Sequence, residues 1–116
     1  MVKKNEPFCP PDLLRGNTDI LLLSMIDELG ASYGYQLIKH IENRSNGFFR
    51  FREGTIYPAL RKLENEGFTI GEWQTLPNGL RRRYYHLTEK GVKLLRAKKS
   101  TWRDFTAAVD LVLKPG

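Results

Sequence analysis

The tripeptide Pro77-Asn78-Gly79 separates two short segments that have the composition of β-strands, residues 68–74 and 82–87. Both segments are rich in aromatic and β-branched residues, which favour strands. An Asn-Gly pair readily adopts the positive φ angles that tight hairpin turns require. The 116-residue chain, long enough for one domain, is therefore predicted to contain a β-hairpin, and the patterns on either side of it decide the fold.

Helical patterns occupy most of the remaining chain. Apolar residues recur at spacings of three and four before and after the hairpin, and the expected helices span residues 12–29, 32–44, 53–66 and 88–113. Gly30 and Gly67 are positioned to end the first and third helices. Ser32 and Thr88 are positioned to cap the second and fourth. Residues 48–52 alternate weakly and predict a short strand.

Pro58 indicates where the third helix begins. A proline in a helix interior removes a hydrogen bond, whereas the first turn tolerates it because the N–H groups there have no intrahelical partner. The third helix is therefore expected to start near residue 54 or 55.

The order of these elements predicts a mainly α fold with a small β-hairpin. Three helices followed by a hairpin form a winged helix-turn-helix, whose third helix can enter the major groove of DNA while the hairpin lies along the backbone. The last helix has an apolar seam with coiled-coil-like spacing, which suits pairing with a second copy. The expected parts are a basic flexible arm (residues 1–11), a winged helix-turn-helix domain (12–87) and a C-terminal dimerisation helix (88–116).

The charge balance favours a polyanionic partner. Lys and Arg total 19 against 13 for Asp and Glu, a net charge of +6, which suits nucleic acid, although the same charge also serves solubility. The longest apolar run, residues 20–23, is far too short to cross a bilayer, and the N-terminus lacks the apolar core of a signal peptide. A single cysteine, Cys9, fits a reducing compartment. We expect a cytoplasmic protein without a membrane partner.

Basic side chains gather on the third helix and on the hairpin. Arg61 and Lys62 lie away from the apolar face of their helix. Arg81, Arg82 and Arg83 follow the hairpin turn with no acidic neighbour in the sequence, and strand alternation directs Arg82 to the face opposite the other two. Such a cluster matches the phosphate backbone of DNA. The alternative is a solvated charge run that protects an edge strand.

Three blocks of this sequence resemble the signature blocks of the PadR family of transcriptional regulators, in its short, LmrR-like branch. They read YGYQL (33–37), GTIYPALRKLENEG (54–67) and RRRYYHLTEKG (81–91). The resemblance implies a homodimeric repressor that binds double-stranded DNA at a palindromic operator, with the third helix of each subunit in the major groove. Together with the charge pattern, it assigns DNA contacts to Tyr33, Tyr35, Thr55, Tyr57, Pro58, Arg61, Lys62, Arg81, Arg82 and Arg83. For Tyr57 the alternative is packing in the core.

The same resemblance implies a second site on the last helix. In the LmrR-like branch an equivalent tryptophan faces its symmetry mate across a pore in which flat aromatic compounds stack. A small aromatic effector is thus expected at an interface formed by Trp102, Phe105, Val109 and Ile20, with plain interface packing as the alternative. Lys98 and Lys99 stand one turn before Trp102, and Thr106 stands one turn after it where an acid would suit a cation. A ligand here would therefore be neutral or anionic, or absent.

No catalytic residue, metal site or cofactor is predicted. The sequence has no nucleophile elbow or P-loop, and Cys9, His40 and His86 are too scattered to resemble a ligand set. The protein is not expected to be an enzyme. The alternative function is a winged helix used for protein contacts, or one that binds nucleic acid without sequence preference.

Overall fold

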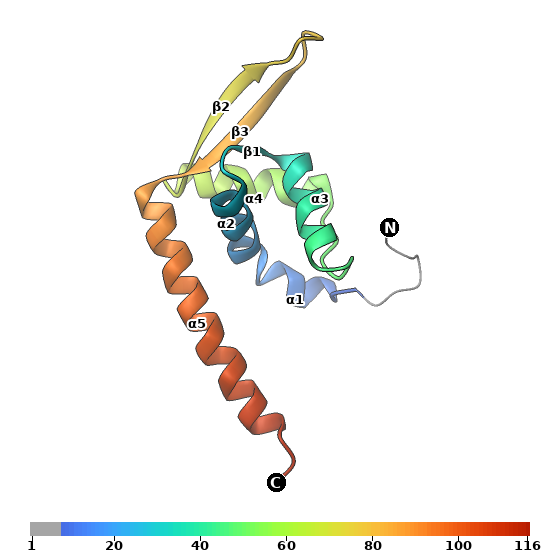
Figure 1. The fold of residues 1–116 in the computed structure, drawn as a ribbon, viewed down its shortest axis with the longest axis vertical. Coiled ribbons are helices and arrows are strands. Elements are labelled where there is room, and N and C mark those ends of the chain that lie inside the picture. The colour runs from blue at the N-terminus through green and yellow to red at the C-terminus, as the bar shows by residue number, and fades with distance from the viewer. Residues whose placement is uncertain (1–7) are drawn as a thin grey trace.

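The computed structural model describes residues 8–116 of the chain. In order, its elements are α1 (Pro11–Arg15), α2 (Thr18–Leu29), β1 (Ser32–Tyr33), α3 (Gly34–Arg44), α4 (Glu53–Asn65), β2 (Thr69–Thr75), β3 (Arg81–Leu87) and α5 (Glu89–Leu113). Figure 1 shows α2, α3 and α4 grouped together, the β2–β3 hairpin projecting from one end of this group and α5 running past it toward the other. The predicted winged helix-turn-helix with a long final helix is confirmed.

The core lies where α2, α3 and α4 meet. Helical spacing places apolar side chains on their inner faces, and those that are almost completely buried are Leu22, Leu23, Ile26, Leu37, Ile56, Leu60 and Leu63. Tyr85 of β3 and Leu95 of α5 extend the same cluster to the sheet and to the last helix. Full burial of one such side chain contributes about 1.5–3 kcal/mol, so the cluster fixes α4 relative to the hairpin.

The helical pattern over residues 12–29 forms two helices where one was expected. Gly16 and Asn17 separate α1 from α2, and the Asn17 side-chain amide donates a hydrogen bond to the Leu13 carbonyl at 2.8 Å. Asparagine competes with the helical backbone in this way, and glycine loses more conformational entropy in a helix than other residues. The end of α2 is as predicted, because Gly30 leaves the helix with a φ angle of 78°.

The sheet contains a strand that the sequence did not reveal. β1 pairs antiparallel with β3, so the strand order is β1-β3-β2. Ser32 was expected to cap a helix, but it lies fully buried in β1, where its hydroxyl donates to the Gly30 carbonyl at 2.6 Å. The helix begins two residues later, and the Tyr33 N–H donates to the Gln36 side chain at 3.4 Å. Two residues are too few to show strand alternation, which is why β1 was missed.

The expected strand over residues 48–52 is wrong. These residues form an irregular connection between α3 and α4, and Phe51 is buried in the core. The Phe48 carbonyl accepts a hydrogen bond from the Cys9 N–H at 2.7 Å. The connection is therefore fixed by one buried ring and by the N-terminal segment. Residues 1–7 of the expected arm, which include Lys3 and Lys4, lie outside the described residues.

Pro58 lies deeper in its helix than expected. α4 begins at Glu53, so Pro58 is in the helix interior and not in the first turn. Its missing N–H deprives the Gly54 carbonyl of the usual helical donor. Gly54 is exposed, so that solvent can satisfy this carbonyl.

The final helix has the predicted length and cap. The Thr88 hydroxyl accepts a hydrogen bond from the Gly91 N–H at 3.0 Å, and the helix then continues to Leu113. Gly91 and Leu95 are its buried residues, whereas its second half extends away from the helical group (Figure 1). Across residues 8–116, no helix combines the length and apolarity that a membrane span requires.

Candidate nucleic-acid interface

α4 turns a polar face to solvent beside the hairpin. Ile56, Leu60 and Leu63 point into the core. The residues left exposed on the helix include Thr55, Tyr57, Pro58, Arg61 and Lys62. All five were predicted DNA contacts, and their exposure leaves this face of α4 open to a partner.

α4, the hairpin and the start of α3 surround an open concavity of about 530 Å³. It is lined by Tyr33, Gly34, Tyr57, Arg61, Glu64, Trp73, Arg81, Arg82, Arg83 and Tyr85. Six predicted contacts from three separate segments thus meet around one hollow. Its lining holds four arginines and one carboxylate, so the concavity carries a positive potential. We call this surface the basic concavity.

Tyr57 lies between the core and the basic concavity. A Cβ atom at Gly34 would stand 2.6 Å from Cε1 of Tyr57, so only a glycine lets the ring lie on the first turn of α3. The ring is nevertheless 40% exposed. Burial, and to a smaller extent the nearby Glu53 carboxylate, raises the pKa of the Tyr57 hydroxyl. A tyrosine hydroxyl is protonated at neutral pH even without this shift, so Tyr57 can donate a hydrogen bond.

We call the β2–β3 hairpin the wing. Its three arginines lie on the faces that strand alternation predicts. The Cζ atoms of Arg81 and Arg83 lie 4.9 and 5.4 Å from the ring centroid of Trp73. Arg82 is on the other face, with its Cζ 4.3 Å from the ring centroid of Tyr33. An aromatic ring thus supports each guanidinium and limits its freedom.

Arg83 has an acidic partner, which corrects the expectation that no acid balances this run. Its Nε donates to Oε1 of Glu64 at 3.4 Å, and its Nη2 donates to Oε2 of the same carboxylate. Only 27% of the Arg83 side chain and 25% of the Glu64 side chain are exposed. Hydrogen bonding to Glu64 raises the pKa of Arg83. The partner lies 19 residues away on α4, out of reach of a search among sequence neighbours.

The remaining predicted contacts lie outside the basic concavity. Tyr35 is half exposed on α3, with the Lys39 ammonium 5.6 Å from its ring centroid. Thr55 lines a separate hollow of about 620 Å³ together with Arg15, Arg50 and Arg52. Pro58 and Lys62 lie on the exposed face of α4 without lining either hollow.

Trp73 and Glu64 belong to this surface and were missed. Trp73 pairs directly with Arg83 across the hairpin, so aligning the two strands symmetrically about Asn78, the middle residue of Pro77-Asn78-Gly79, could have found it. Glu64 gives no comparable signal, because its approach to the wing depends on how α4 packs against the hairpin.

The predicted effector residues partly converge. Trp102, Phe105 and Ile20 line a hollow of about 440 Å³ between α1, α2 and α5, and the rings of Trp102 and Phe105 stack with centroids 5.8 Å apart. Lys98 is the one charged residue in this lining. Val109 lies further along α5 and is not part of the hollow. We call this space the Trp102 hollow.

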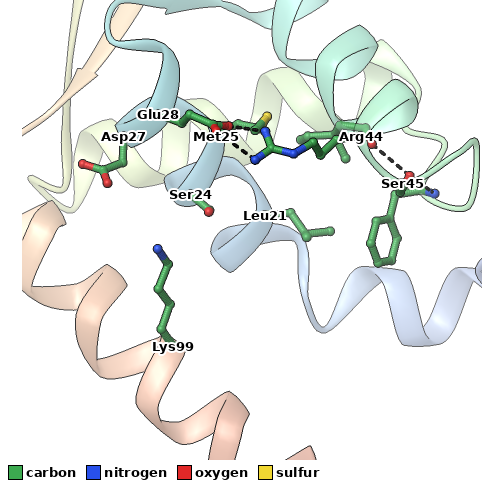
Figure 2. A pocket seen from close by; sticks show the side chains of 10 residues that line it. Leu21, Ser24, Met25, Asp27, Glu28, Arg44, Ser45 and Lys99 are labelled. Carbon is green, nitrogen blue, oxygen red and sulfur yellow. Dashed lines mark hydrogen bonds and ion pairs between the residues drawn. The ribbon is translucent and has the colours of Figure 1, made fainter.

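A fourth hollow, of about 410 Å³, lies between α2, α3 and α5. Figure 2 shows Arg44 of α3 reaching across to Glu28 of α2, while Lys99 of α5 points toward α2. The hydrogen bond from Arg44 lowers the pKa of Glu28. This ion pair ties the ends of α2 and α3 together. Within residues 8–116, no group of three or more His, Cys, Asp or Glu side chains is placed to hold a metal ion.

Known proteins resemble this chain in sequence and in fold. The model of the transcriptional regulator PadR-like family matches residues 22–97, more than half of the chain. A transcriptional regulator from Clostridium thermocellum is 29% identical, with a TM-score of 0.80 over 89% of this chain and 99% of its own. A PadR family regulator from Clostridium difficile is 32% identical, with a TM-score of 0.72 over 85% of this chain and 100% of its own.

An uncharacterized protein of Lysinibacillus sphaericus is 29% identical over 103 residues, which is 89% of this chain and 94% of that protein. The predicted family is thereby confirmed, while membership of the LmrR-like branch stays a prediction. The chain belongs to the PadR-like family of DNA-binding transcriptional regulators.

Proposed function

We propose that this protein is a homodimeric repressor that acts in the cytoplasm and binds a palindromic operator through α4 and the wing. The observation that carries this proposal is the basic concavity, in which Arg61 of α4 and Arg81, Arg82 and Arg83 of β3 meet beside the exposed face of α4. A cationic surface that borders an exposed helix matches a duplex whose groove admits the helix and whose phosphates flank it.

The state of α5 supports the homodimer. Leu111, Val112 and Leu113 near its end are 75, 83 and 74% exposed, and Phe105 is 56% exposed. An apolar stretch of this size is costly in water and favours association. A second copy would cover it and would place two α4 helices on one face of the duplex. Dimeric helix-turn-helix proteins bind two DNA half-sites about 34–36 Å apart, which is one helical turn of DNA.

The Trp102 hollow supports a small aromatic effector at the dimer interface. It offers two stacked rings, and its one charged lining residue is Lys98, so a neutral or anionic planar compound fits better than a cation. A compound bound there would shift the population toward dimers with a different packing of α5, and hence a different separation of the α4 helices.

Selection of DNA followed by a salt titration tests the DNA-binding proposal. Duplexes that the purified protein retains from a genomic library define the operator, and binding is then measured against a shuffled duplex. We expect roughly a 10³-fold or larger preference for the operator and a log–log salt slope of about −0.9 per neutralised phosphate. Arg82→Ala should make the slope shallower by about one unit.

Lys114→Ala is the matched control, because Lys114 follows the end of α5 far from the wing (Figure 1) and should leave the slope unchanged. Binding without preference for the selected duplex would instead indicate a non-specific nucleic-acid protein. Absence of salt-dependent binding would indicate a module for protein contacts.

Tryptophan fluorescence tests the effector proposal. Trp73 on the wing is first replaced by Phe, so that emission reports on Trp102 alone. We expect saturable quenching by neutral or anionic planar compounds, and release of the operator at the same concentrations. If no compound in such a panel quenches the emission, Trp102 serves as interface packing.

A further inference from the structure

We propose that Arg83 holds the wing at a fixed angle to α4 and does not neutralise a DNA phosphate, which leaves that role on the wing to Arg81 and Arg82. This inference rests on the proposed function, because it divides the roles within the DNA-binding surface. In this view Arg83 is a positioning residue that affects the choice of sequence more than the overall strength of binding.

Glu64 provides the Arg83 guanidinium with a hydrogen-bonded counter-ion from within the protein. Nε and Nη2 engage the two oxygens of one carboxylate, a fork-to-fork arrangement that fixes direction as well as distance. The pair is about three-quarters buried, with 27 and 25% of the two side chains exposed. Solvent screens such a pair less than it screens an exposed one. Because Glu64 belongs to α4 and Arg83 to β3, the pair joins α4 to the wing.

β2 is shaped to receive this side chain. A Cβ atom at Gly71 would stand 2.7 Å from Nε of Arg83 and 2.9 Å from its Cζ. The guanidinium therefore crosses the strand at a residue without a side chain. The Trp73 ring lies 5.4 Å from Cζ on the same strand. Glycine is otherwise unfavourable in a strand, so its presence here is explained by the path of Arg83 toward Glu64.

The two neighbouring arginines have different surroundings. Arg81 and Arg82 are exposed, whereas most of the Arg83 side chain is buried. Among residues 8–116, the ion pairs are Arg15–Asp12, Arg44–Glu28 and Arg83–Glu64, so Arg81 and Arg82 lie beyond ion-pair distance of any acid there. Each guanidinium packs on an aromatic ring and is exposed to solvent, so it is accessible to a DNA phosphate.

A fixed wing angle matters for specificity. When α4 reads base edges, a wing held in one orientation can contact the flanking phosphates at the same time. A wing that pivots can still meet phosphates on any duplex, but it must lose that freedom to join α4 on the operator. Removing the Arg83–Glu64 pair should therefore weaken operator binding while leaving binding to other duplexes nearly unchanged.

A pair of lysine substitutions separates the two roles. Arg82→Lys and Arg83→Lys both keep the net charge, but lysine cannot form the two-pronged contact with Glu64. Each variant is titrated with a selected operator duplex and with a shuffled duplex of equal length. We expect Arg82→Lys to keep the wild-type operator preference and Arg83→Lys to lose about tenfold of it, equivalent to about 1.4 kcal/mol.

Two further variants disrupt the Arg83–Glu64 pair in other ways. The double variant Glu64→Gln/Arg83→Gln leaves the net charge unchanged, and Gly71→Ala keeps every charged side chain while displacing the Arg83 guanidinium. Both should lose operator preference like Arg83→Lys and keep a salt slope on the shuffled duplex no shallower than that of the wild type. The matched Arg82→Gln variant should have a slope shallower by about 0.9. Circular dichroism confirms that each variant is folded.

The outcomes separate this inference from the proposed function. Wild-type operator preference in Arg83→Lys, or a slope in the double variant as shallow as that of Arg82→Gln, would assign Arg83 to a phosphate and overturn the inference alone. A wild-type protein without any operator preference would refute the proposed function and the inference together.

Discussion

The two ends of α5 have opposite surroundings. Its first turn is fastened to the end of α4 by hydrogen bonds and one close backbone contact, so this end is complete within a single chain. Its last turn carries Leu111, Val112 and Leu113, each at least 74% exposed. One end of α5 is therefore rigidly joined to the end of α4, and the other end leaves its apolar side chains exposed to solvent.

The fastened end uses backbone carbonyls at the end of α4 and just beyond it. The Thr88 hydroxyl donates to the Gly67 carbonyl at 2.7 Å, and the Thr88 N–H donates to the Phe68 carbonyl at 3.2 Å. The Lys90 ammonium donates to the Glu66 carbonyl at 2.7 Å. These bonds give partners to the carbonyls of the α4 C-cap residue and of the two residues after it. They also make the direction of α5 depend on that of α4.

This difference shows how one helix can serve two tasks in the proposed dimer. A second copy that covers the exposed end would place the two α5 helices against each other. Because the first turn of each α5 is fixed to the end of α4, the angle between the two α5 helices would then determine the distance between the two α4 helices. The proposed effector in the Trp102 hollow would lie between these two ends and would alter that angle.

The largest expected effect comes from crowding the fastened end. A Cβ atom at Gly91 would lie 2.0 Å from the Phe68 carbonyl oxygen, which is backbone and cannot swing away. We expect Gly91→Ala to lower the free energy of unfolding by about 3 kcal/mol, the upper part of the usual range for overpacking. Urea denaturation followed by circular dichroism measures this loss.

Gly54→Ala is the matched control, since Gly54 also lies in a helix but a Cβ atom there would meet open space. It should be neutral or stabilising by up to about 1 kcal/mol, because alanine has the higher helix propensity. Equal stability of the two variants would contradict the close approach of α5 to Phe68.

Local patterns account for most of what the sequence predicted. The hairpin followed from Asn78-Gly79, the α5 cap from Thr88 and the buried face of α4 from the spacing of Ile56, Leu60 and Leu63. Each of these depends on residues within a turn or two of one another. The sequence also indicated the arginines of the wing and of α4, and the structure brings them together in the basic concavity.

Contacts between distant segments account for three features that it missed. β1 is a strand because it meets β3, and its two residues show no pattern of their own. The pairing of Arg83 with Glu64 arises from the packing of α4 against the wing. The requirement for glycine at position 91 arises from the Phe68 carbonyl, which lies between α4 and β2. In each case the partner is chosen by tertiary structure, which residue spacing does not encode.

The second expected effect concerns the exposed apolar end of α5. Replacing Leu111, Val112 and Leu113 together by Ser should raise the dissociation constant of the proposed dimer by about 100-fold or more, because burying even one such side chain contributes about 1.5–3 kcal/mol. Sedimentation velocity over a range of concentrations measures this constant. The free energy of unfolding at concentrations where the chain is monomeric should change by less than about 0.5 kcal/mol, as for other exposed positions.

Lys114→Ala, just beyond the replaced segment, should leave the dissociation constant unchanged. A triple variant that dimerises like the wild type would show that the exposed apolar end has another purpose, and the proposed spacing of the α4 helices would then need a different interface.

The smallest expected effect comes from removing the cap of α5. Thr88→Ala deletes the hydroxyl that accepts from the Gly91 N–H and donates to the Gly67 carbonyl. Loss of such a cap costs about 1 kcal/mol, whereas Thr88→Ser keeps the hydroxyl and should retain most of the stability. Urea denaturation measures both variants at a concentration where the chain is monomeric. The dimer dissociation constant of folded Thr88→Ala should equal that of the wild type, because the cap and the apolar end lie at opposite ends of α5. A cap variant that weakens dimerisation as much as it lowers stability would mean that the two ends are not independent, and that the direction of α5 is set by its partner as well as by α4.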